Sequence, residues 1–133
     1  MLAAWIVVAI VLTGCNQSDS LGQVSGQVTF RGEPVSEGLV LLVGAEQGIH
    51  VTAEVRPDGT FDVVTLDGGG LPPGSYQVGI TPPRVEFPID PSQPLPIVRD
   101  HPDIPAKYRN TATSQLTINV QEGENRLDID MQP

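Results

Sequence analysis

The sequence has little cysteine, few aromatic residues and little positive charge. Its single cysteine, Cys15, excludes an internal disulfide, so the core must be stable without one. Aromatic residues make up only 5% of the 133 residues, whereas glycine and proline number 14 and 13. Because glycine and proline interrupt helices and punctuate turns, this composition favours short strands joined by turns.

The scarcity of positive charge limits the classes of partner. Lysine and arginine total 7 against 16 acidic residues, which gives a formal net charge of −9. A strongly acidic domain repels phosphate backbones, so we do not expect nucleic acid to be a partner. It also repels an anionic membrane surface, so something other than charge would have to hold the protein at a membrane.

A hydrophobic run long enough to cross a bilayer is also missing. The run over residues 2–12 carries no charge, but it stops short of the roughly 20 apolar residues that a spanning helix needs. A short apolar segment ending in small residues is typical of a signal peptide, with a retained membrane anchor as the alternative. No lysine or arginine precedes the run, which departs from the usual signal-peptide pattern.

The run closes on Leu12-Thr13-Gly14-Cys15, and the chain turns polar immediately afterwards. Leucine, two small residues and cysteine in this order resemble the lipobox of bacterial lipoproteins. The resemblance implies that Leu12 fills an apolar pocket of a signal peptidase and that the small Thr13 and Gly14 let the backbone enter it. Cleavage then falls between Gly14 and Cys15, and the Cys15 thiolate carries a diacylglycerol and further acyl chains such as palmitate.

This reading predicts three parts of the chain. Residues 1–14 are a signal peptide, residues 15–21 are the lipidated cysteine with a polar tether, and residues 22–133 are one domain. The lipid bilayer is then a partner through the N-terminal lipid. We expect the protein at the cell membrane or the outer membrane, facing the periplasm or the cell exterior.

The domain is expected to be all-β. Seven stretches are predicted as strands: 22–30, 39–43, 49–55, 61–65, 76–80, 116–120 and 127–131. Six of them alternate apolar and polar residues, as a strand with one buried face does, and residues 39–43 are apolar on both faces. The closely spaced turns imply antiparallel pairing, and two sheets packed face to face bury all the apolar faces.

Residues 82–113 interrupt this pattern. Eight of the 13 prolines lie between Thr81 and Ser114, so few backbone N–H groups remain to pair with a strand. This segment also holds four of the seven cationic residues, namely Arg84, Arg99, Lys107 and Arg109. We expect a surface excursion that carries the contact surface, because long loops on rigid sandwiches commonly carry recognition.

Four motifs resemble those of the carboxypeptidase regulatory-like, or transthyretin-like (prealbumin-like), β-sandwich domains. Residues 24–35 resemble their opening V-x-G-x-V-x-x-x-G-x-P-(L/V), residues 58–61 their D-G-x-F hairpin, and residues 71–78 their L-P-x-G-x-Y-x-V. Residues 104–116 resemble a segment of small bacterial surface lipoproteins built on this domain. The resemblance implies a seven-stranded antiparallel Greek-key sandwich that acts as a binding or structural module without catalytic activity of its own.

Candidate chemistry is sparse. Asp100, His101 and Asp103 are residue types that bind divalent metals, but Pro102 restricts the local backbone and no additional strong ligand lies nearby. A solvated loop is therefore the expectation, with no metal and no cofactor beyond the lipid on Cys15. No Ser-His-Asp arrangement, activated cysteine or phosphate-binding loop is evident.

An enzyme of the same fold offers a further comparison. Hydroxyisourate hydrolases are transthyretin-like enzymes that end in Tyr-Arg-Gly-Ser, whereas residues 130–133 here are Asp-Met-Gln-Pro. We therefore expect no enzymatic activity.

We expect a module of the cell envelope whose ligand is unknown and whose partner would be an envelope glycan or a protein. The alternative is a domain that binds carbohydrate. Sugar-binding sandwiches stack exposed aromatic rings on pyranose faces, and only Phe87 and Tyr108 fall outside the inward faces of the predicted strands. Tyr108 has the alternative of packing within its own segment. In this alternative the protein is a carbohydrate-binding accessory domain that uses the 82–113 loop.

Overall fold

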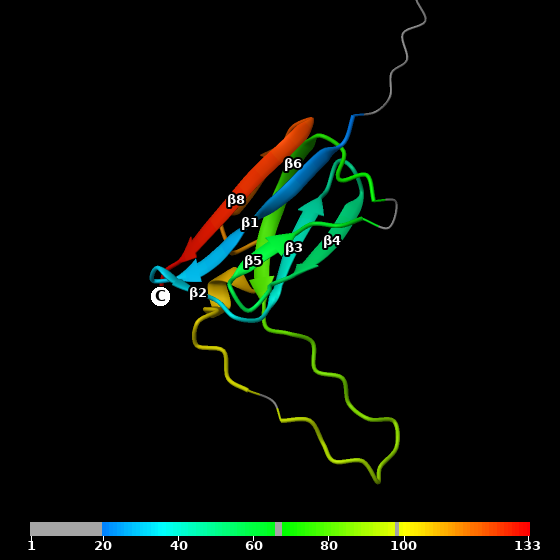
Figure 1. Ribbon diagram of the computed structural model, residues 1–133, viewed down its shortest axis with the longest axis vertical. Coiled ribbons are helices and arrows are strands. Elements are labelled where there is room, and N and C mark those ends of the chain that lie inside the picture. The colour runs from blue at the N-terminus through cyan, green and yellow to red at the C-terminus, as the bar shows by residue number, and fades with distance from the viewer. Residues whose placement is uncertain (1–19, 66–67, 98) are drawn as a thin grey trace, which may run out of the picture.

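The computed structural model describes residues 20–65, 68–97 and 99–133 (Figure 1). These residues form strands and one short 3₁₀ turn: β1 (Gly22–Phe30), β2 (Glu33–Pro34), β3 (Leu39–Gly44), β4 (Ile49–Glu54), β5 (Thr60–Asp62), β6 (Gly74–Thr81), η1 (Ala106–Tyr108), β7 (Leu116–Val120) and β8 (Gly123–Met131). The all-β prediction is confirmed. The predicted signal segment and the sites at Leu12, Thr13, Gly14 and Cys15 lie outside the described residues.

The strands build two sheets that pack face to face (Figure 1). In one sheet β1 pairs with β8 along its whole length, and with β2 and β5 on its other side. In the other sheet the order is β4-β3-β6-β7. The inner faces meet in a single apolar core that includes Val28, Leu42, Phe61, Tyr76 and Ile80.

The alternation read from the sequence sets which side chains enter this core. Along β6 the predicted inward residues Tyr76, Val78 and Ile80 are all buried, because alternate side chains of a strand point to the same face. Strand β3 is less buried than its composition suggests. Val40 and Leu42 lie in the core, whereas Leu39, Leu41 and Val43 remain half-exposed on the outer face.

The number of strands differs from the prediction, at eight among the described residues instead of seven. Residues 33–34 lie outside the predicted strands, but they pair with Thr29 and Phe30 as the short strand β2. Arg31 and Gly32, with φ of 51° and 81°, form the two-residue connection. Positive φ at both central positions suits the twist of a tight hairpin, which is why two further residues can pair.

The prediction of antiparallel pairing throughout is wrong for one pair of strands. Strands β1 and β8 run parallel over nine residue pairs, from Gly22–Gly123 to Phe30–Met131. Tight turns impose antiparallel pairing only on consecutive strands. No turn joins β1 to β8, so the path of the whole intervening chain decides their direction.

Candidate functional site

The excursion expected over residues 82–113 consists of two parts that behave differently. We call residues 82–100 the arm and residues 101–114, one residue beyond the predicted excursion, the clasp. The arm leaves the end of β6 and projects from the two sheets, whereas the clasp returns along the sheets and contains η1 (Figure 1). Residue 98, within the arm, is outside the described residues.

Buried side chains hold the clasp against the sheets. Ile104 is fully buried and Tyr108 is 7% exposed. Ser114 is also buried, and its hydroxyl donates a hydrogen bond to the carbonyl oxygen of Val78 in β6. The clasp therefore packs against the sheets, and its buried side chains are part of the core.

Hydrogen bonds within the clasp fix its path. Arg109 donates from Nε to the carbonyl oxygen of Ile104 at 2.8 Å and from Nη2 to that of His101 at 3.0 Å. The hydroxyl of Thr113 donates to the carbonyl oxygen of Lys107 at 2.8 Å. These bonds give three carbonyl oxygens of the clasp side-chain donors, and that of His101 also accepts the backbone N–H of Ile104 at 3.0 Å.

Tyr108, one of the two rings considered for stacking on a sugar, is not on the surface. Its ring packs in the core, and its hydroxyl oxygen accepts a hydrogen bond from the backbone N–H of Gln132 at 3.0 Å. A tyrosine ring is large and apolar, so the free energy of folding favours burying it wherever its hydroxyl finds a partner. A sugar therefore has no access to the face of this ring.

The arm shows the opposite distribution of apolar side chains. Ile89 is fully exposed, and Phe87, Leu95 and Ile97 are 64%, 75% and 87% exposed. Val85, nearer to the sheets, is 37% exposed. Apolar side chains scattered singly on a surface need no explanation, but five within thirteen residues of one projecting segment are an unusual concentration of exposed apolar surface.

The tip of the arm is an ordered turn. The Asp90 carboxylate accepts hydrogen bonds from the backbone N–H of Ser92 at 2.9 Å and from its hydroxyl at 2.7 Å, and the N–H of Gln93 donates to the Asp90 carbonyl oxygen at 3.1 Å. The bonds from Ser92, its backbone N–H first, lower the pKa of Asp90 below its ordinary value of 3.8. A charged carboxylate therefore marks the point where the arm reverses.

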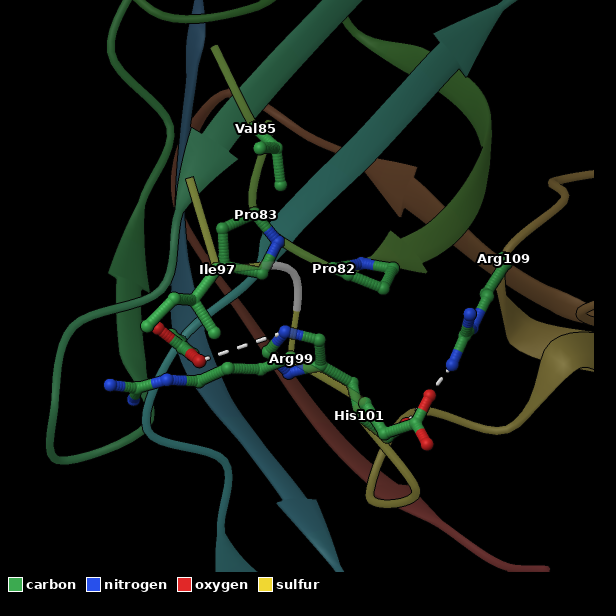
Figure 2. Close-up of a pocket in the computed structure, with 9 residues that line it drawn as sticks. Pro82, Pro83, Val85, Ile97, Arg99, His101 and Arg109 are labelled. Carbon is green, nitrogen blue, oxygen red and sulfur yellow. Dashed lines mark hydrogen bonds and ion pairs between the residues drawn. The ribbon is translucent and has the colours of Figure 1, made fainter. Parts of the chain in front are cut away.

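A cleft of about 540 Å³ lies where the two ends of the arm meet the clasp. Figure 2 shows Pro82, Pro83 and Val85 from one end of the arm, and Ile97 and Arg99 from the other, around this cleft. Side chains of both charge signs line it, namely Glu37, Arg99, Asp100, His101 and Arg109.

Of the three candidate metal ligands, Asp100 and His101 line this cleft and Asp103 does not. His101 is nearly buried, and its Nε2 lies 3.7 Å from the Glu37 carboxylate (Figure 2). Among the described residues, no group of three or more His, Cys, Asp or Glu side chains is placed to hold a metal ion. The imidazole of His101 therefore faces the carboxylate of Glu37, which lies in the connection between β2 and β3.

The arm and the N-terminal entry of the chain lie at opposite ends of the two sheets. Gly22, the first residue of β1, bridges to Leu71, with both N–H to carbonyl distances at 2.8 Å. Strand β6 begins shortly after Leu71 and runs eight residues, about 23 Å, before the arm leaves it at Thr81. Figure 1 shows the arm leaving the sheets at the end away from the start of β1.

Sequence reasoning named Phe87 but missed the other exposed apolar side chains of the arm. A local signal for them exists, because Val85, Phe87 and Ile89 alternate with Arg84, Glu86 and Pro88. The surrounding prolines masked this two-residue period. Glu37 was missed as the partner of His101, and no local pattern links residues 64 positions apart.

The comparisons with known proteins return no match: no family model, no curated protein and no solved structure is similar to the chain. Within the described part of the chain, no helix has the length and apolar character needed to cross a membrane.

Proposed function

We propose that the protein is a lipid-anchored module of the bacterial cell envelope, with a transthyretin-like Greek-key sandwich that binds a partner and catalyses no reaction. One observation carries the proposal: the exposed apolar arm projects from the end of the sandwich opposite to the entry of the chain at Gly22. An anchor on one side and a contact surface on the other suit a protein that holds a partner at a membrane.

The anchor is the lipid on Cys15, supported by the resemblance of residues 12–15 to a lipobox. The tether over residues 15–21 spans at most about 25 Å when fully extended, so it keeps the sandwich close to the membrane. Strand β6 then carries the arm a further 23 Å or so away from the end where the tether enters. The arm therefore faces away from the membrane.

The anchor is tested by moving the cysteine. Cys15→Ser should abolish incorporation of labelled palmitate and leave the signal segment uncleaved. Cys15→Ser/Ser18→Cys is the matched control, because it keeps a cysteine in the tether but removes it from the Leu12-Thr13-Gly14 context. Unchanged labelling and cleavage in Cys15→Ser would overturn the anchor.

Carbohydrate binding by the arm is the second candidate, and the exposed ring of Phe87 is the observation that favours it. Binding on a glycan array that disappears in Phe87→Ala but persists in Leu95→Ala would support stacking on this ring. An array without signal would contradict carbohydrate binding and favour a protein as the partner of the arm.

A further inference from the structure

The first half of the arm has the pattern of an unpaired strand. Val85, Phe87 and Ile89 share one side of an extended segment, and Arg84 and Glu86 share the other. All three apolar side chains are exposed. The prolines that flank and follow this stretch, Pro82, Pro83 and Pro88, lack an N–H group, so ladder pairing of the segment would begin at Arg84 and end before Pro88.

Strand β4 offers an edge that such a segment would fit. It is the end strand of its sheet, and among the described residues no strand pairs with its outer side. A groove of about 540 Å³ lies beside it, lined by the exposed Val64 (74%), by the buried Ala53 and Val55, and by the charged Glu54, Arg56 and Asp62. An edge with no paired strand among the described residues, beside a groove of mixed apolar and charged lining, is an arrangement that accepts an added strand.

The hydrogen bonds of β4 to β3 determine which of its residues face the free edge. The N–H of Val55 donates to the carbonyl oxygen of Gly38 at 2.9 Å, so Val55 points its backbone groups toward the β3 side. Backbone groups alternate in direction along an antiparallel strand. The N–H and carbonyl groups of His50, Thr52 and Glu54 therefore point outward, to the side on which no described strand pairs with β4.

One antiparallel register satisfies the backbone, the apolar side chains and the charges together. It places Arg84 opposite Glu54 and Glu86 opposite Thr52, where both arm residues have an N–H to donate. Val85, Phe87 and Ile89 then lie on the same face as the inward side chains of Ala53, Val51 and Ile49. The guanidinium of Arg84 meets the carboxylate of Glu54, and Val85 reaches the groove beside Ala53.

The arm is too short to reach the edge of its own sheet in this register. Thr81, Leu39 and Glu54 lie in one row across β6, β3 and β4, so the position beyond Glu54 is three strand spacings, about 14 Å, from Thr81. Three residue steps from Thr81 to Arg84 cover at most about 11 Å. An arm that pairs with this edge in this register therefore has to come from another copy.

We infer that two copies of this protein associate by strand addition, with residues 84–89 of one copy lying antiparallel beside β4 of the other and pairing through Arg84 and Glu86. Charge opposes this contact little, because residues 82–100 carry three acidic and two basic residues, a net charge of −1, and most of the net charge of −9 lies elsewhere. The arm of one copy thus approaches a second acidic copy with little repulsion. The inference specifies the partner of the arm in the proposed function and does not depend on the lipid.

Disulfide trapping tests the register directly. The full chain is studied in detergent with Cys15→Ser in every variant, so that no other thiol competes. Val85→Cys and Ala53→Cys, carried by separate copies and mixed, should cross-link into dimers, because facing residues lie within about 4.5–5.5 Å. Ile49→Cys, at the far end of β4, is the matched control and should not cross-link to Val85→Cys.

Sedimentation of the unmodified chain provides a measurement that does not depend on new thiols. The chain should form dimers, and Phe87→Asp, a change at an exposed site, should weaken the dimer by at least about tenfold. Arg84→Glu and Glu54→Arg should each weaken it by about fivefold, and the double variant should restore it. A chain that stays monomeric at every concentration, a disulfide formed within one chain, or equal cross-linking to position 49 would overturn the inference. None of these outcomes alters the palmitate result at Cys15.

Discussion

The arm and the clasp are adjacent parts of one proline-rich excursion with opposite structures. Among the described residues the clasp forms five backbone hydrogen bonds of its own and buries Ile104 and Tyr108. The arm forms one, at its tip, and exposes five apolar side chains. The difference lies in what each part can pack against, because the clasp returns over β6 and the arm leads away from it.

This comparison shows that composition alone does not assign an apolar residue to the core. Ile97 and Ile104 have the same side chain and lie seven positions apart, yet Ile97 is 87% exposed and Ile104 is fully buried. A buried isoleucine stabilises the fold through the apolar area it removes from water, and an exposed one does not. The exposed side chains of the arm are therefore available for intermolecular contacts.

The largest expected effect is the contrast between these two isoleucines. Ile104→Ala should lower the free energy of unfolding by about 2–5 kcal/mol, because it leaves a cavity in a fully buried site. Ile97→Ala, the matched variant in the arm, should change it by less than about 0.5 kcal/mol. Urea unfolding followed by circular dichroism measures both, and equal effects would mean that the clasp is not part of the core.

A smaller effect is expected from the hydroxyl that ties the clasp to the C-terminal end of β8. Tyr108→Phe keeps the buried ring but removes the oxygen that accepts the N–H of Gln132. The loss should cost about 1 kcal/mol in urea unfolding, with the amide of Gln132 losing protection in hydrogen exchange. Phe87→Leu, a similar change on an exposed ring of the arm, is the control and should leave stability unchanged.

The smallest expected effect comes from a comparison of two turns, in each of which an aspartate carboxylate accepts hydrogen bonds from the residue two positions later. In the hairpin between β4 and β5, the pKa of Asp58 is lowered below 3.8 by the hydroxyl of Thr60 first and then by its backbone N–H, as the pKa of Asp90 is lowered by Ser92 in the arm. A carboxyl whose pKa is lower in the folded state stabilises the fold above the unfolded pKa, near 4, and this contribution disappears as the pH falls through the lowered value.

Only the Asp58 turn is tied to the rest of the fold, since the N–H of Val28 in β1 donates to the carbonyl oxygen of Gly59 at 2.8 Å. Asp58→Asn should therefore be less stable than the natural chain at pH 7, with the difference shrinking toward pH 2. Asp90→Asn should show no such pH-dependent difference. Urea unfolding at a series of pH values measures both variants, and an equal pH dependence would place the arm within the cooperative fold.

The sequence predicted the class of fold and most strand positions because these depend on local patterns. Alternation placed Tyr76, Val78 and Ile80 on one face, and they are buried together. The extra strand β2 was not predicted, because one of its two residues is a proline and two residues are too few to show a periodic pattern. The site was predictable in part. Phe87 could be recognised as an exposed ring, but the sequence did not distinguish the buried clasp around Tyr108 from the exposed arm, because both are rich in proline.

What the sequence determined by itself is the direction in which each side chain of a strand points, since that follows from a repeat of two residues within one strand. It also located the turns, where glycine, proline and aspartate have conformations that few other residues adopt. Only the tertiary structure decided that β1 and β8 run parallel, that Ile104 is buried while Ile97 is exposed, and that no described strand pairs with the outer side of β4. These outcomes depend on contacts between segments far apart in the chain, and no local repeat encodes which distant segments meet.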